Sequence, residues 1–340
     1  MNTAIALGLS GVLLGGLLNG SFVVPMKRIH GWKWENTWLI YSLTGLLIFP
    51  LALALATIPH VTALITEAPP GILVKVLLFG FGWGIGSVLF GLGVTRLGLA
   101  LGYGVILGVV ATAGSLLPLV LLHPGRVLTW QGFMIFAGTA LVVIGIAFCV
   151  LAGRSRDRGA CTLARNPNGT SFLSGLLICI LAGFFAAMLN LAFTFGTPLQ
   201  QQAVTAGVRP TAAANVLWAL ALGAGFLPNA GYSLYLMRKN RSWQLYFQET
   251  GEFTPWLSAG LMGIVFFASF IVYGIGADEL GSLGGVVGWP VLMSMSLITA
   301  NAWGWLMGEW KMADTSARRH LITGVVVLIL AIVVISAGNG

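Results

Sequence analysis

Ten apolar runs, each about as long as a membrane-spanning helix, follow one another along the 340 residues of the chain. A helix needs about 20 apolar residues to cross the hydrocarbon core of a bilayer, so ten spans leave no room for a sizeable domain outside the membrane. Charged residues make up only 8% of the sequence, against about 25% in an average soluble domain. The sequence therefore predicts an all-α integral membrane protein and excludes a soluble globular one.

Charged residues and helix breakers set the bounds of the predicted helices. The first five cover 4–26, 34–57, 72–94, 97–121 and 128–153. The second five cover 171–195, 212–237, 255–276, 282–307 and 319–337. The basic stretch RSRDRGACTLARNPNGT (154–170) separates the two sets. We expect this stretch to be a cytoplasmic linker between an N-terminal half, 1–153, and a C-terminal half, 171–340.

Basic residues are sorted between the two sides of the predicted bundle. The connections after the odd-numbered helices hold 14 of the 17 lysines and arginines, namely Lys27, Arg28, Lys33, Arg96, Arg154, Arg156, Arg158, Arg165, Arg238, Lys239, Arg241, Lys311, Arg318 and Arg319. The other three are Lys75, Arg126 and Arg209. Connections rich in Lys and Arg stay in the cytoplasm, so we expect both termini to be periplasmic. The scatter of these charges between apolar runs also argues against a nucleic-acid partner.

Two glycine-rich turns have related sequences. FGLGVTRLGLALG (90–102) and YGIGADELGSLGG (273–285) align without gaps, and four glycines and one leucine are identical. Glycine-rich membrane turns can resemble one another by chance, but five identities in order favour a repeat. Because each half has five helices, an odd number, equivalent halves would be inverted relative to each other. We therefore expect two inverted five-helix repeats.

Motifs of enzyme chemistry are lacking in the sequence. The four histidines lie at helix ends or in loops without metal-ligand spacing, and the three cysteines have no metal or redox spacing. GFGWGIG (80–86) is not followed by the Lys-Ser/Thr pair of a phosphate-binding loop, and its glycines instead suit close helix packing. We expect no enzymatic activity, no metal and no cofactor.

Neutral polar and aromatic side chains inside the predicted spans are the candidates for a binding site. Aromatic faces and amide groups together suit a neutral polyhydroxylated solute. The candidates are Trp83, Asn190, Asn229, Tyr232, Tyr273 and Asn301. For any single asparagine, a hydrogen bond between helices is an equally good explanation. For Trp289, which is near a predicted interface, we expect a place in the aromatic belt of the membrane.

Acidic residues are few, and none is clearly at the centre of a predicted span. Glu35 and Glu309 are near predicted cytoplasmic ends, whereas Asp278 and Glu279 fall in an outer turn. Proton-coupled transporters place a titratable group on their pathway. For Glu35, an ion-pair cluster with Lys27 and Arg28 at the interface is the favoured interpretation.

Two segments resemble a known family. PMKRIHGWKWENTW (25–38) and FGFGWGIGSVLFGLGVTRLGLALGYG (79–104) are similar to segments of bacterial L-rhamnose/proton symporters, in the drug/metabolite transporter superfamily. Shorter similarities reach Trp289 and Glu309, so the resemblance covers nearly the whole chain. It implies ten helices in two inverted repeats, an inner-membrane location, and import of a deoxyhexose with protons by alternating access. On this basis Glu309, and after it Glu35, are the expected proton-coupling residues.

The chain departs from this family at three places where members carry ionisable residues. These places read Gly196-Thr197, Gln200-Gln201-Gln202 and Leu283-Gly284-Gly285-Val286. Loss of these charges is compatible with L-rhamnose, with a related monosaccharide, or with uncoupled facilitated diffusion. An exporter of other small metabolites would have the same fold. The expected partners are the sugar, the proton and the lipid bilayer, and the fold is compatible with a homodimer.

Overall fold

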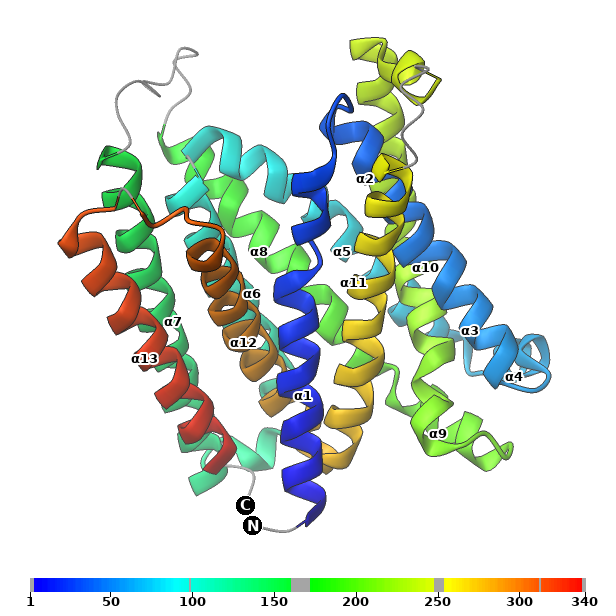
Figure 1. The fold of residues 1–340 in the computed structure, drawn as a ribbon. Coiled ribbons are helices and arrows are strands. Elements are labelled where there is room, and N and C mark those ends of the chain that lie inside the picture. The colour runs from blue at the N-terminus through cyan, green and yellow to red at the C-terminus, as the bar shows by residue number, and fades with distance from the viewer. Residues whose placement is uncertain (1–2, 98, 160–171, 248–253, 312, 338–340) are drawn as a thin grey trace.

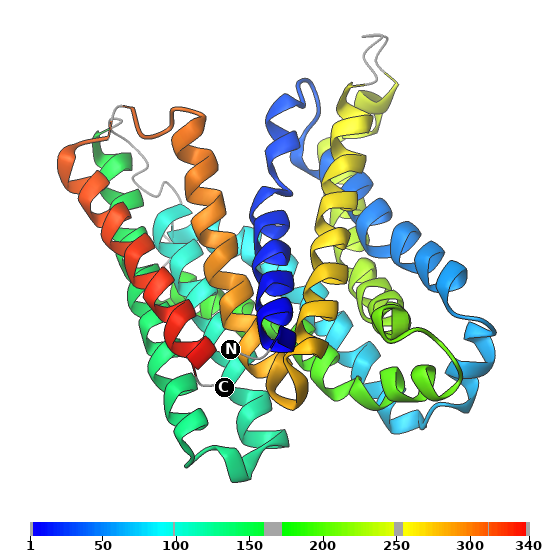
Figure 2. The ribbon, with the colours of Figure 1, turned by 60° about the horizontal axis from the view of Figure 1, so that its bottom comes forward.

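The structure, a computed structural model, is a bundle of helices (Figures 1 and 2). It describes residues 3–97, 99–159, 172–247, 254–311 and 313–337, apart from the side chains of residues 95, 97, 99–101, 103, 157–159 and 172. Within these ranges there is no strand, and ten helical segments are long and apolar enough to cross a membrane. The predicted all-α membrane fold is therefore confirmed.

The helices agree with the predicted spans to within a few residues at most ends. The N-terminal half contains α1 (Thr3–Ser21), α2 (Trp34–Ser42), the π-helix η2 (Leu43–Ile48), α3 (Phe49–Thr57), α5 (Pro70–Leu97), α6 (Leu99–Leu122) and α7 (Trp130–Gly159). The C-terminal half contains α8 (Phe172–Phe195), α10 (Pro210–Asn240), α11 (Thr254–Glu279), α12 (Gly284–Leu306) and α13 (Thr315–Ala337). Because α7 runs on to Gly159, the first part of the predicted linker is helical, and its residues 160–170 lie outside the described residues.

Short helices occupy several of the connections. They are η1 (Val24–Arg28), α4 (Val61–Glu67), η3 (Pro124–Arg126), α9 (Thr197–Thr205), η4 (Ser242–Tyr246) and η5 (Gly281–Leu283). The second span is one continuous helix whose middle turn is the π-helix η2. Pro50 follows this turn and has no N–H to donate to the preceding turn, which accounts for the widened backbone there.

The long helices pack in pairs that correspond between the two halves. α1 packs against α11 and α12, and α8 packs against α5 and α6. α7 and α13 lie together at one edge of the bundle (Figure 1). The first span corresponds to the sixth, the third to the eighth, and the fourth to the ninth. When corresponding spans are exchanged, the pairs α1–α11 and α1–α12 become the pairs α8–α5 and α8–α6. Two inverted repeats would produce this pairing, and the repeat stays a prediction.

The start of α1 and the end of α13 lie on the same side of the bundle, here called the terminal side (Figure 1). Since successive spans reverse direction, α6, α8 and α11 end on this side, and α10 and α12 begin there. Figure 1 also shows α4 and α9 toward this side. The terminal side is the one predicted to be periplasmic.

Trp289 lies in the protein interior and not in an aromatic belt. Its side chain is only 2% exposed, and its Nε1 donates a hydrogen bond to the Val110 carbonyl at 3.2 Å. Gly114 of α6 makes room for the indole, because a Cβ atom there would lie 2.3 Å from Trp289 Nε1. The expected interfacial position is therefore wrong, since the neighbouring glycine lets a large ring enter the contact between α6 and α12.

Candidate functional site

A cavity of about 810 Å³ opens at the helix ends on the terminal side. The ends of α6, α8 and α11, the starts of α10 and α12, and the short helix α9 all contribute to its wall. Its polar side chains are His123, Thr194, Thr197, Gln200, Gln201, Thr205, Asp278 and Ser282. Hydroxyl and amide groups dominate this set, with one carboxylate, which suits a ligand that offers several hydroxyl groups.

The short helix α9 brings two glutamines to the cavity. It begins at Thr197 and has Pro198 in its first turn, where a missing N–H costs nothing. Gln200 is buried beside Asp278, and its amide nitrogen, when turned toward the carboxylate, lies 3.3 Å from each oxygen. Gln201 is exposed in the cavity wall. Asp278, at the end of α11, is also exposed there, so its carboxylate is open to solute and water from the terminal side.

Asn190 and Tyr273 form a polar cluster directly behind the cavity wall. Asn190 is fully buried, and its Nδ2 donates to the carbonyls of Gly114 at 2.7 Å and Gly285 at 2.8 Å. The Tyr273 hydroxyl donates to Asn190 Oδ1 at 2.8 Å. Gly285 itself lines the cavity. Two of the six candidate binding residues are thus brought together, where they fix α6, α8, α11 and α12 around the cavity.

A second polar cluster lies away from the cavity, between α2, α5 and α10. Asn229 Oδ1 accepts hydrogen bonds from Trp38 Nε1 and Ser87 Oγ, both at 2.9 Å. Trp83 stacks on Phe266, with ring centroids 5.9 Å apart. It also packs against Gly225, the residue whose carbonyl accepts from Asn229 Nδ2.

Two other predicted binding residues are separate from Asn190 and Tyr273. Tyr232 lies near Trp34, with ring centroids 6.4 Å apart. Asn301 donates to the Leu297 carbonyl and lines a cavity of about 170 Å³ together with Arg156 and Trp310. The six predicted binding residues are therefore not all in one place.

Glu309 joins three elements on the side opposite the terminal side. Its carboxylate accepts from Lys27 of η1, and it lies 3.3 Å from Arg156 Nη1 of α7. The Arg156 guanidinium also lies over the Trp310 ring, 5.0 Å from its centroid. Glu309 follows α12, so these contacts tie the C-terminal half to the N-terminal half.

Glu35 has different partners from those expected. Its Oε1 accepts from Asn240 Nδ2 at 2.8 Å and from Ser242 Oγ at 2.9 Å, and the residue is 4% exposed. The expected cluster with Lys27 and Arg28 is wrong, because the end of α10 and the start of η4 pack over Glu35 and Lys27 instead reaches Glu309. Ion pairs between distant segments depend on packing that the sequence alone does not specify.

Comparisons with known proteins agree on one family. The model of the family described as L-rhamnose-proton symport protein (RhaT) matches residues 1–340. The chain belongs to this family. An L-rhamnose-proton symporter of Klebsiella pneumoniae subsp. pneumoniae is 28% identical over 344 residues, and the match covers 99% of each chain. L-rhamnose-proton symporters of an Enterobacter species and of Mannheimia succiniciproducens are 28% and 26% identical, also over 99% of each chain.

Membership of the L-rhamnose-proton symport family makes the chain a transporter and not an enzyme. With ten apolar spans in the part of the chain that the structure describes, it is a multi-pass protein of the inner membrane. The three neutral stretches where the sequence is expected to depart from the family contribute Thr197, Gln200, Gln201, Gly285 and Val286 to the wall of the cavity.

Among the polar residues of the cavity wall, sequence reasoning singles out Thr197, Gln200 and Gln201 only as departures from the family and not as binding residues. The signal for Gln200 and Gln201 was present, since three consecutive glutamines are unusual among apolar runs. The sequence predicts a turn at Asp278, because this residue lies within the glycine-rich repeat at the end of a span. Its exposure to a cavity results from the packing of α9 and α12 beside it, which no local pattern predicts.

Proposed function

We propose that this protein imports L-rhamnose together with protons, and that the sugar enters through the cavity on the terminal side. The observation that carries this proposal is the cavity wall, in which hydroxyl and amide groups surround one accessible carboxylate, Asp278. Names of full-length relatives support the choice of sugar and of coupling ion. The wall also includes Phe193, Leu122 and Val286, and apolar surface of this kind suits the C–H face and the methyl group of a deoxyhexose.

Transport by alternating access fits the contrast between the two sides. The terminal side carries the open cavity, and on the opposite side Glu309 bridges Lys27 and Arg156. We infer that these ion pairs hold the opposite side closed in this conformation. For the sugar to leave there, they would have to separate, and protonation of Glu309 would favour separation by removing its negative charge.

Three carboxylates are proposed for the path of the proton. Asp278 is the one exposed to the cavity, and it would accept a proton arriving from the terminal side with the sugar. Glu309, which is 40% exposed, would take part on the opposite side. Glu35 lies near the same side as Glu309, and its carboxylate accepts hydrogen bonds from two neutral groups, the Asn240 amide and the Ser242 hydroxyl. It is therefore the third candidate.

Thermal stabilisation by sugars tests whether the cavity binds rhamnose. A ligand that binds only the folded protein stabilises it by about 2.7 kcal/mol at 100 times its Kd. We expect L-rhamnose to raise the Tm of the purified protein more than other hexoses and deoxyhexoses do, measured at two pH values. Gln201→Leu should abolish this rise, because it removes an amide from the cavity wall.

The neighbouring glutamine provides a matched control. Gln202 lies on the same helix but is not part of the cavity wall. Gln202→Leu should keep the full rise in Tm with L-rhamnose. Equal responses of the two variants would show that the sugar does not bind in this cavity.

A further inference from the structure

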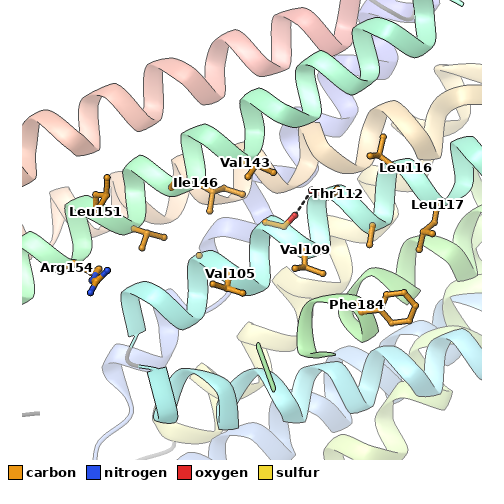
Figure 3. Close-up of a pocket in the computed structure, with 15 residues that line it drawn as sticks. Val105, Val109, Thr112, Leu116, Leu117, Val143, Ile146, Leu151, Arg154 and Phe184 are labelled. Atoms are coloured by element: carbon orange, nitrogen blue, oxygen red, sulfur yellow. Dashed lines mark hydrogen bonds between the residues drawn. The ribbon is translucent and has the colours of Figure 1, made fainter. Parts of the chain in front are cut away.

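A second cavity, of about 800 Å³, is a groove between α6, α7 and α8 (Figure 3). Its wall is apolar apart from Thr112, whose hydroxyl donates to the Gly108 carbonyl of its own helix, and Arg154 at one end. Val143, Leu151 and Phe184 on the rim are 41–45% exposed. Since these helices cross the membrane, the groove opens to lipid and is unsuited to a sugar.

The length of the groove corresponds to one leaflet of a bilayer. Arg154 is near the end of the span Trp130–Arg156, and Val143 is at its middle. From Val143 to Arg154, eleven residues of helix at about 1.5 Å each extend about 16 Å, and on α6 the thirteen residues from Gly104 to Leu117 extend about 20 Å. Half of a hydrocarbon core is about 15 Å thick. Figure 3 shows Arg154 at one end of the groove and Leu116 and Leu117 toward the other. A chain lying in the groove would therefore reach from the headgroup level to the bilayer centre.

We propose that this groove binds an acyl chain of an anionic phospholipid, with the phosphate of the headgroup at Arg154. The charge is complementary, because a guanidinium binds phosphate oxygens and sits where the headgroups of that leaflet lie. Among the described residues, no acidic side chain forms an ion pair with Arg154. Gly108 gives the groove its depth, since a Cβ atom there would have nothing within 4 Å.

Native mass spectrometry of the purified full-length protein tests the proposal with dioleoyl phosphatidylglycerol and dioleoyl phosphatidylcholine as probes. The wild type should bind phosphatidylglycerol about fivefold more tightly, as one arginine near a headgroup implies. Gly108→Leu should weaken binding of both lipids by about tenfold, because its side chain fills the groove. Arg154→Gln should lower the affinity for phosphatidylglycerol to that for phosphatidylcholine and leave the latter unchanged.

Matched variants control for general effects. Gly260→Leu, at another helical glycine with nothing within 4 Å of its Cβ position, and Arg238→Gln, at another exposed arginine near a helix end, should bind both lipids as the wild type does. Ala147 lies on the opposite wall of the groove, so Ala147→Leu should also weaken binding of both lipids by about tenfold. This variant provides the test if Gly108→Leu fails to fold. Thermal melting without added lipid shows which variants are folded.

Three results would overturn the proposal. One is equal affinity of the wild type for the two lipids. Another is unchanged phosphatidylglycerol binding by folded Gly108→Leu or Ala147→Leu. The third is that light scattering finds the wild type to be a dimer and finds Gly108→Leu or Ala147→Leu to be a monomer. A second copy of the chain, and not a lipid, would then occupy the groove.

Discussion

At the scale of single residues, Asn190 is a buried polar side chain whose hydrogen bonds join four helices. Its amide nitrogen uses both hydrogens and its oxygen accepts from Tyr273, so it joins α6, α11 and α12 to its own helix, α8. An unpaired polar group in the hydrocarbon region costs several kcal/mol, roughly as much as in an apolar protein interior. Removal of this side chain should therefore affect the whole cavity region.

We predict that Asn190→Leu lowers the free energy of unfolding by about 3 kcal/mol, because two carbonyls and one hydroxyl lose their partner. Tyr273→Phe should cost about 1 kcal/mol, since it removes one hydrogen bond. Ser10→Ala is the control, because Ser10 is exposed and bonds only within its own helix turn. Melting temperatures in detergent rank the three variants, and an Asn190→Leu protein as stable as Ser10→Ala would contradict this account.

At the scale of helices, glycines allow the closest contacts between spans. On α5, a Cβ atom at Gly80 would lie 2.2 Å from the Ala221 carbonyl oxygen, and one at Gly84 would lie 2.4 Å from the Gly225 carbonyl oxygen. Both contacts are with the backbone of α10, which cannot move aside as a side chain can. The glycine spacing in GFGWGIG (80–86) thus serves helix packing, as the sequence predicts.

We predict that Gly84→Val lowers the free energy of unfolding by about 3 kcal/mol, because added atoms would push α5 away from α10. Gly231→Val on α10 is the matched control, since a Cβ atom there has nothing within 4 Å. Thermal melting of the two variants side by side measures the difference. Similar melting temperatures would mean that the two helices do not depend on this close approach.

The spans could be predicted from sequence because a bilayer demands long apolar runs, which any single helix displays locally. The short helices α4 and α9 could not, since seven and nine residues are too few for a membrane signal. The cavity could not be predicted either, because five long helices and α9 build its wall. Asn190 and Tyr273 were each recognisable as polar groups at depth, but their contact depends on how α8 and α11 pack.

At the scale of the whole molecule, the sorting of basic residues predicts the orientation. In the predicted orientation the cavity would face the periplasm, and the Lys27–Glu309–Arg156 ion pairs would face the cytoplasm. Such an orientation suits an importer, because the cavity in this conformation is open to external sugar.

Cysteine labelling checks this orientation. In a variant whose native cysteines are replaced, we predict that Ser282→Cys, in the cavity wall, reacts with a membrane-impermeant maleimide on intact cells. Lys239→Cys, exposed at the other end of α10, should react only after permeabilisation. The reverse pattern would show that the chain has the opposite orientation.

Accumulation of labelled L-rhamnose in proteoliposomes with an imposed inward proton gradient is the most direct test of proton-coupled import. The account predicts that the wild type concentrates the sugar above its external level and that a protonophore abolishes this accumulation. Asp278→Asn should still exchange sugar across the membrane at equal concentrations but lose accumulation driven by the gradient. Sugar uptake that only equilibrates, with or without the gradient, would contradict proton coupling in this protein.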